Sequence, residues 1–199
     1  MLSLLYLTLS EPETAKKEID SRDKRLEAAI SRLADGENSA CAEIYEEARS
    51  SVYAFALSIV KNSQDAEDVM HDTFVAIFTH AQSYKPQGKP LAWILTVTRN
   101  FCLKTLKKNQ RAVSKEEDWE RYEEEGSDEA EQTEKRLIIH EMLKLLSDEE
   151  RQIITLHAVS GLKHRQIAEL LDIPLSTVLS KYNRAIKKLR NKMEGGNGE

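Results

Sequence analysis

Glycine and proline are scarce in this chain, with 7 glycines and 4 prolines among 199 residues. Sandwiches and barrels of β-strands need frequent tight turns, so the shortage favours helices. Hydrophobic residues make up 40% of the sequence, which is enough for a packed core. We therefore expect an all-α fold.

Motifs for metals, nucleotides and covalent catalysis are missing as well. The two cysteines, Cys41 and Cys102, form no CxxC or Cys/His cluster, which predicts reduced structural thiols. There is no glycine-rich phosphate loop, and the histidines pair with neither a nucleophile nor a metal-ligand spacing (His71, His80, His140, His157 and His164). The sequence predicts no catalytic residue, no metal and no cofactor, and it argues against an enzyme.

Long hydrophobic runs are also missing. No segment reaches the roughly 20 apolar residues that a membrane-spanning helix needs. Residues 1–10 are apolar, but they lack the basic start and the cleavage site of a signal peptide. We expect a cytoplasmic protein without membrane insertion.

Carboxylates are missing from one long stretch, residues 73–115. The chain has 34 acidic residues in 199, a ratio that predicts about seven in a stretch of this length. The stretch instead carries only basic charges: Lys85, Lys89, Arg99, Lys104, Lys107, Lys108, Arg111 and Lys115. Four acidic residues precede it, and residues 111–134 contain eleven acidic and three basic residues. A solvated helix face is one explanation; the other is a surface for a polyanion beside a surface for a basic partner.

Apolar side chains recur at helical spacing in four segments of the first half: residues 16–34, 39–60, 64–80 and 91–108. Ser63 is the expected N-cap of the third segment, and residues 81–90 are expected to form a loop. Asp65, Asp68 and Asp72 fall on one face of the third helix, where three like charges repel and suit a basic partner surface.

The composition of residues 111–134 predicts a linker and therefore two domains. A helix is expected near residues 133–146. Ser147 and Glu150 then match a capping box at the start of the next helix, which Gly161 ends.

Residues 161–190 predict a helix-turn-helix: a short helix at 163–171, the turn Asp172-Ile173-Pro174, and a longer helix at 175–190. Ala168 allows the two helices to cross closely, and Val178 fixes the second helix against the first. Small polar and basic residues on the outer side of the second helix suit a major groove, where hydroxyls reach base edges and cations mostly meet phosphates. Simple bundle packing is the alternative.

Together the two halves resemble a sigma factor of bacterial RNA polymerase, of the small extracytoplasmic-function (ECF) group. Residues 65–74 (DAEDVMHDTF) resemble the polymerase-binding helix of that family, and residues 91–100 (LAWILTVTRN) resemble its promoter-melting helix. Residues 161–190 resemble its C-terminal helix-turn-helix.

The resemblance implies a sigma factor that binds core RNA polymerase, on the clamp helices of its largest subunit, and directs promoter recognition and transcription initiation. It divides the chain into an N-terminal extension (1–24), a region-two domain (25–111), an acidic flexible linker (112–134) and a region-four domain (135–194). Region two would melt the promoter element about ten base pairs upstream of the start, and region four would bind the element about thirty-five base pairs upstream. An anti-sigma factor is a further partner that the resemblance allows.

The predicted site residues fall into three groups. Polymerase binding is assigned to Asp65, Glu67, Asp68, His71 and Asp72. Binding of the melted promoter is assigned to Tyr84, Lys85, Gln87, Lys89, Trp93, Arg99, Asn100 and Lys104. Binding of the upstream element is assigned to Ser176, Thr177, Ser180, Lys181, Arg184 and Lys188.

The chain departs from the family pattern at Leu179, where a basic residue is common, at Asp172, where glycine is usual, and at Asn183, where histidine is common. A one-component helix-turn-helix regulator is the alternative function. That alternative does not account for the stretch without carboxylates or for the aspartates at 65, 68 and 72.

Overall fold

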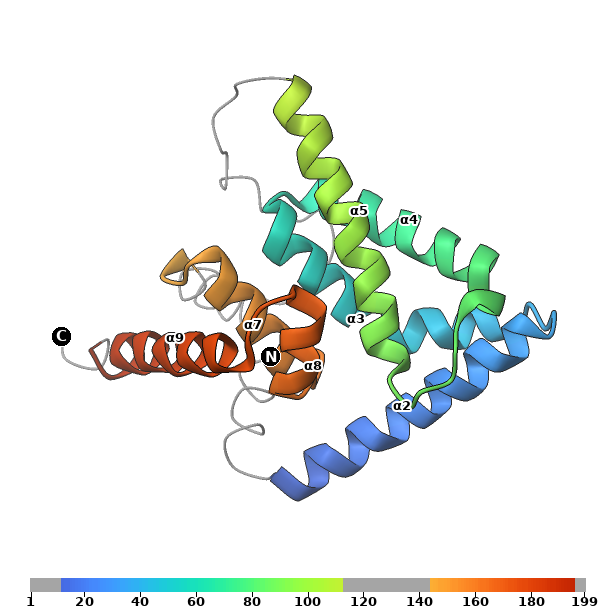
Figure 1. Ribbon diagram of the computed structural model, residues 1–199, viewed down its shortest axis with the longest axis horizontal. Coiled ribbons are helices and arrows are strands. Elements are labelled where there is room, and N and C mark those ends of the chain that lie inside the picture. The colour runs from blue at the N-terminus through green and yellow to red at the C-terminus, as the bar shows by residue number, and fades with distance from the viewer. Residues whose placement is uncertain (1–11, 113–143, 196–199) are drawn as a thin grey trace, which may run out of the picture.

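The computed structural model describes the backbone of residues 12–112 and 144–195 and the side chains of residues 17–110 and 144–192. In this part of the chain every regular element is a helix, which confirms the all-α prediction (Figure 1). The elements in chain order are α2 (Pro12–Ala34), α3 (Ala40–Val60), α4 (Ser63–His80), the 3₁₀ turn η1 (Ala81–Ser83), α5 (Pro90–Ala112), α7 (Asp148–Ala158), α8 (His164–Leu171) and α9 (Leu175–Gly195). None of the described helices is long and apolar enough to cross a bilayer.

Helix α3 is the centre of the molecule, because it packs against α2, α4, α5 and α7. Its apolar residues accordingly lie on more than one face, and Ile44, Val52 and Phe55 are fully buried. Burying one such side chain stabilises the fold by about 1.5–3 kcal/mol.

Several helix ends differ from the predictions. Asn62, and not Ser63, is the N-cap of α4, since the Asn62 side chain accepts a hydrogen bond from the Asp65 amide at 2.9 Å. Both residue types cap helices well, so adjacent candidates are hard to separate in sequence. Helix α5 begins at Pro90; the first residue of a helix has no intrahelical partner for its N–H, so proline loses no hydrogen bond there. Both α5 and α9 end several residues later than predicted.

The C-terminal helices carry the predicted local signals. Ser147 and Glu150 form the capping box of α7 in both directions. Asp172 ends α8 with φ of 57°, so it occupies the left-handed turn position that glycine usually fills. The helix-turn-helix of α8 and α9 is therefore present as predicted, with Val178 fully buried between the helices.

The N-terminal and C-terminal helices pack on each other and share one core, which includes Ile153, Leu156 and Leu162 from the C-terminal part. The contacts lie between α3 and α7 and between α5 and α8 (Figure 1). A smaller apolar cluster joins α7 to α9: Leu146, Ile154, Ala185 and Leu189. The apolar residues 1–10, which are part of the predicted N-terminal extension, the acidic linker and most of the predicted helix at 133–146 lie outside the described residues.

Candidate functional site

Helix α4 turns an acidic face to the surface, because the apolar side chains on its opposite face are buried. Ala66, Val69 and Phe74 point into the core and hold the helix in a fixed rotation. That rotation leaves four of the five predicted polymerase-binding residues exposed: Glu67, Asp68, His71 and Asp72. Within the part of the chain that the structure describes, none of these four side chains has an ion-pair partner. Asp65 is half-buried, and its carboxylate accepts a hydrogen bond from the side-chain amide of Asn109 on α5 at 2.8 Å.

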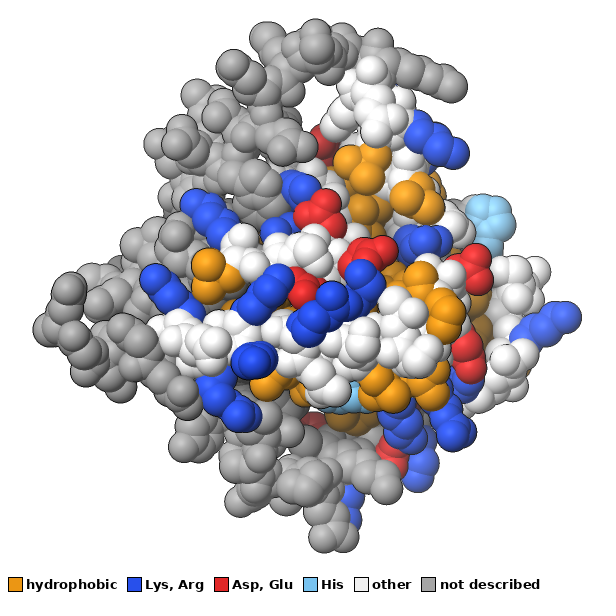
Figure 2. Space-filling view, turned by 60° about the vertical axis from the view of Figure 1, so that its left-hand side comes forward, with side chains coloured by type: hydrophobic (Ala, Val, Ile, Leu, Met, Phe, Trp, Pro, Cys, Tyr) orange, Lys and Arg blue, Asp and Glu red, His pale blue; other side chains and the backbone are white. Residues whose placement is uncertain are grey.

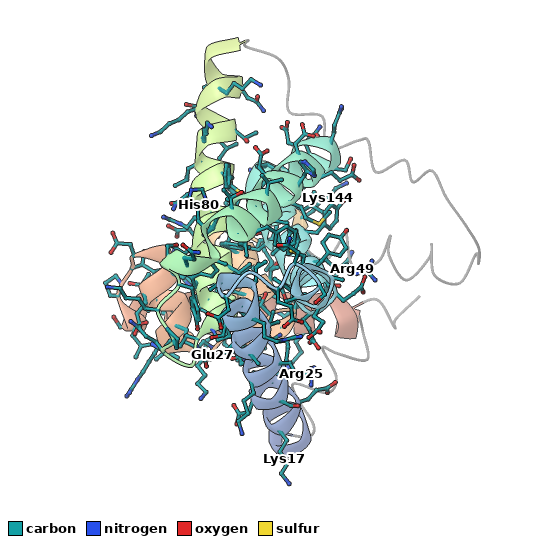
Figure 3. All side chains as sticks on the ribbon, turned by 90° about the vertical axis from the view of Figure 1, so that its right-hand side faces the viewer. Lys17, Arg25, Glu27, Arg49, His80 and Lys144 are labelled. Atoms are coloured by element: carbon teal, nitrogen blue, oxygen red, sulfur yellow. The ribbon has the colours of Figure 1, made fainter. Side chains whose placement is uncertain are left out.

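The loop between α4 and α5 is held in place by Glu27 on α2. One oxygen of this carboxylate accepts hydrogen bonds from the Tyr84 hydroxyl at 3.0 Å and from the Gly88 amide at 3.1 Å. Burial, together with the hydrogen bond to Glu27 and its negative charge, raises the pKa of Tyr84 to about 12. Figure 3 shows Glu27 and Arg25 on opposite sides of α2. Arg25 turns toward α3, where its guanidinium pairs with Glu47.

Two predicted promoter-binding aromatic residues pack on each other. The rings of Tyr84 and Trp93 lie 5.0 Å apart between centroids, at an interplanar angle of 51°, and both side chains are half-buried. Among the other predicted residues of this group, five are exposed: Lys85, Gln87, Lys89, Asn100 and Lys104. The structure thus places an aromatic pair and two exposed lysines, Lys85 and Lys89, at the start of α5 and in its preceding loop, whereas Asn100 and Lys104 lie further along the helix.

Two members of the same group contact α8 of the helix-turn-helix. The Lys89 ammonium pairs with Glu169 at 3.1 Å. The guanidinium of Arg99 is half-buried and donates to the carbonyl oxygen of Leu171 at 3.4 Å. Sequence reasoning places both side chains on DNA and does not foresee these contacts.

Helix α9 exposes Ser176, Ser180, Arg184 and Lys188, whereas Thr177 and Lys181 are half-buried. Basic side chains gather on this side of the molecule with carboxylates between them (Figure 2). Two of the predicted DNA-binding lysines pair with the first turn of α7: Lys181 with Glu149, and Lys188 with Glu150 at 2.6 Å. Arg184 instead turns back along its own helix and donates to the Ser180 carbonyl oxygen at 3.3 Å.

Leu179 lies on the exposed side of α9, with 41% of its surface accessible. An apolar side chain at this place offers no hydrogen bond to a base edge, although it can contact the methyl group of thymine. The departure from the family pattern is therefore on the exposed surface of α9, next to residues that the sequence predicts to bind DNA.

Three rings join α7, α8 and α9, a cluster that sequence reasoning missed. His157 and His164 stack at 4.6 Å between centroids, and Tyr182 meets the two rings edge-on at 5.0 and 4.7 Å. Nδ1 of His157 lies 2.9 Å from the carbonyl oxygen of Leu162, and Nε2 of His164 is buried without a partner. Burial, and then the charge of a protonated His157, lowers the pKa of His164. The three rings thus pack on one another across α7, α8 and α9. No group of three metal-ligating residues occurs in the described ranges.

Comparison with known proteins identifies the two halves. The family model for Sigma-70 region 2 matches residues 44–112, and the model for Sigma-70 region 4 matches residues 136–189. The chain belongs to the ECF sigma factors. It is similar to the ECF RNA polymerase sigma factor SigK of Mycobacterium tuberculosis, at 26% identity over 175 residues that cover 83% of this chain and 92% of the relative. SigK of Mycobacterium ulcerans is 26% identical over 176 residues, or 85% of this chain and 94% of that one.

Two solved structures share the fold of this sigma factor. CnrH in complex with the cytosolic domain of CnrY matches with a TM-score of 0.61 and 20% identity over 86% of this chain and 98% of that one. The sigma factor RpoE, in complex with the anti-sigma factor NepR from Bartonella quintana, matches with a TM-score of 0.56 and 23% identity over 72% and 89%. The sigma factor binds core RNA polymerase and promoter DNA, and it directs transcription initiation.

Glu27 is the main residue of the site that sequence reasoning missed. Its partners lie 57 and 61 positions further along the chain, so no local spacing connects them. A glutamate next to the apolar residue Leu26 of an amphipathic helix is the signal that was available, and it is a weak one.

Proposed function

We propose that this sigma factor uses the exposed carboxylates of α4 to dock on a basic helical surface of core RNA polymerase. The observation that carries this assignment is that an acidic surface lies beside a surface without carboxylates. Glu67, Asp68 and Asp72 are exposed on α4, and α5 beside it contains no carboxylate along its whole length. One surface suits a basic protein, and the other suits a nucleic-acid backbone.

We assign the opened promoter strand to α5 and to the loop before it. Nucleobases stack on aromatic rings with little regard to sequence, at about 1–3 kcal/mol per base. Tyr84 and Trp93 supply such rings, Lys85 supplies an exposed cation next to Tyr84 in the chain, and Lys104 supplies another further along α5. The protein performs no reaction of its own in this proposal, because the polymerase supplies the chemistry, and its place of action is the bacterial cytoplasm.

We assign the upstream element to the outer side of α9. The exposed hydroxyls of Ser176 and Ser180 can reach base edges, and Arg184 can meet a phosphate or a guanine once it leaves Ser180. By analogy with the RpoE complex, an anti-sigma factor is a further partner of this chain.

The proposed docking face is tested by reversing its charge. The double substitution Asp68→Lys, Asp72→Lys should weaken binding to core polymerase at least about tenfold at low salt, since like charges then face each other. Asp35→Lys is the matched control, because Asp35 is an exposed aspartate in the turn between α2 and α3. Equal affinity of the double variant and the control would refute the assignment.

A one-component regulator predicts a different result. Such a protein binds duplex promoter DNA tightly without polymerase, whereas the sigma factor needs core polymerase for run-off transcription from a promoter library.

The Arg184→Ala variant should lower the salt dependence of upstream binding by about one unit of slope if this side chain contacts a phosphate. A wild-type slope would remove Arg184 from the interface.

A further inference from the structure

All of α2 lies outside the two matched family ranges, 44–112 and 136–189, and its N-terminal half is the part that reaches the C-terminal helices. It extends past the neighbouring helices toward the C-terminal part of the molecule (Figure 1). Lys17 marks its far end in Figure 3. The residues that follow Lys17 therefore need an explanation other than the two family domains.

Ile19 and Arg22 on this half of α2 contact the turn between α7 and α8. The Arg22 guanidinium donates to the Ser160 carbonyl oxygen at 2.9 Å and pairs with Asp23 at 3.2 Å. Its side chain is only 15% exposed. The carbonyl oxygens at the C-terminal end of a helix carry partial negative charge, so the end of α7 is a favourable place for this cation.

Gly161 gives Ile19 the space that it occupies. A Cβ at position 161 would lie 2.6 Å from Cδ1 and 2.8 Å from Cγ1 of Ile19, closer than real Cβ contacts come. Gly161 also has φ of 68°, a conformation that other residues adopt only with strain. The turn that leads into the helix-turn-helix is thus fitted to α2 both in shape and in charge.

We propose that the N-terminal half of α2 is a clasp that binds region four of the same chain and, together with the packing of α3 on α7 and of α5 on α8, keeps the free sigma factor closed. The clasp consists of Ile19 and Arg22, and its partner is the turn at Ser160 and Gly161. The proposal rests on the proposed function at one point: Lys89 and Arg99, assigned above to promoter DNA, contact α8 in the closed state. Closure therefore competes with DNA for these side chains.

Closure and promoter binding also exclude each other by distance. Two elements about 25 base pairs apart are separated by about 85 Å of duplex, at 3.4 Å for each base pair. In the closed state α5 and α8 are in direct contact. The 31 residues from 113 to 143 span up to about 100 Å when extended, so the chain is long enough to let the two regions separate.

The test compares full-length wild type with the Ile19→Ala, Arg22→Ala variant in the absence of polymerase. Binding of a short mixed-sequence DNA duplex and the radius of gyration from small-angle scattering are measured. Opening raises the apparent affinity because only the open fraction binds. We expect about a tenfold increase in duplex affinity and an increase of several ångströms in the radius of gyration.

Arg25→Ala is the matched control, since Arg25 lies on the same helix but pairs with Glu47 within the N-terminal part. It should leave both readings at the wild-type value. If the double variant does not fold, Ile19→Ala alone carries the test. Readings equal to wild type in a folded clasp variant overturn the proposal, as does an equal response of Arg25→Ala.

Binding to core polymerase separates this inference from the proposed function. The exposed carboxylates of α4 belong to a different helix from the clasp, so the clasp variant should bind core at least as tightly as wild type. Failure of wild type to bind core would refute the proposed function. Failure of the variants to open would refute only the clasp.

Discussion

Replacing Glu27 by Ala should release the loop between α4 and α5. The change removes the acceptor of two hydrogen bonds, one from the Tyr84 hydroxyl and one from the Gly88 amide. Hydrogen bonds to charged groups contribute about 1.5–3 kcal/mol each when buried and less when exposed. Tyr84 is half-buried and Gly88 is exposed, so we expect a total loss of about 2 kcal/mol.

A loss of this size is measurable by thermal unfolding. For a chain of this length, 1 kcal/mol shifts Tm by about 2–4 °C, so Glu27→Ala should lower Tm by about 4–8 °C. Glu18→Ala is the control, because Glu18 is an exposed glutamate on the same helix. It should change Tm by less than about 2 °C.

Tyr84→Phe separates the hydroxyl from the ring. The variant keeps the packing against Trp93 and loses only the hydrogen bond to Glu27. If the two groups interact as the structure indicates, the Glu27→Ala and Tyr84→Phe losses should not add, and the double variant should be more stable than their sum predicts. Additive losses would refute the interaction between the two side chains.

The pH dependence gives a second check on the same contact. The pKa of Tyr84 is about 12 in the folded protein, against an ordinary value of 10.0. A raised pKa stabilises the protonated folded state, so this stability is fully present below pH 10 and is lost as the pH rises toward 12. Wild type should therefore lose more stability than Tyr84→Phe over this range, and parallel curves would contradict the assignment.

Two further predictions concern the C-terminal helices. The pKa of His164 is lowered from its ordinary value of 6.5, so the stability of the folded protein should fall as the pH falls below that value. His164→Phe should therefore flatten the dependence of Tm on pH. An unchanged slope would show that the ring cluster is not the source of this pH dependence. Ser147→Ala removes one half of the capping box of α7 and should lower the free energy of unfolding in urea by about 1 kcal/mol. Ser147→Asp should retain most of this stability, because aspartate also caps helices well. Equal losses of stability in the two variants would argue against a capping role.

Local signals predicted the C-terminal part well because their physics acts within a few residues. The capping box joins Ser147 to Glu150, and the left-handed turn at Asp172 depends on that residue alone. The rotation of α4 followed from the spacing of its apolar residues, which is why Asp68 and Asp72 are exposed as predicted, whereas Asp65 is half-buried against Asn109 of α5. The cap at Asn62 was missed because Ser63 next to it is an equally good candidate.

Contacts between distant segments were not predictable in the same way. Arg22 and Ser160 are 138 positions apart, and the acceptor is a backbone carbonyl that carries no sequence signal. Lys89 and Arg99 were assigned to DNA from their charge, and charge alone does not distinguish a phosphate from a carboxylate or a helix end on the same chain. The stacking of His157 on His164 likewise depends on how α7 and α8 cross.

The ion pairs of α9 change which of its cations are available to DNA. The side chain of Glu150 is only 5% exposed. Burial alone would raise the pKa of this carboxyl group, but the Lys188 ammonium and the hydrogen bonds from the Ser147 backbone and hydroxyl outweigh burial, so the pKa of Glu150 is lowered. If Lys188 moved to a phosphate, this carboxylate would lose its counter-charge and keep its hydrogen bond from the Ser147 amide, at a cost of about 1–3 kcal/mol. We infer that Lys188 stays with Glu150 and fixes α9 against α7. Arg184 gives up only two long hydrogen bonds to Ser180 of its own helix, so it is the cation of the predicted group that can leave for DNA at the smallest cost.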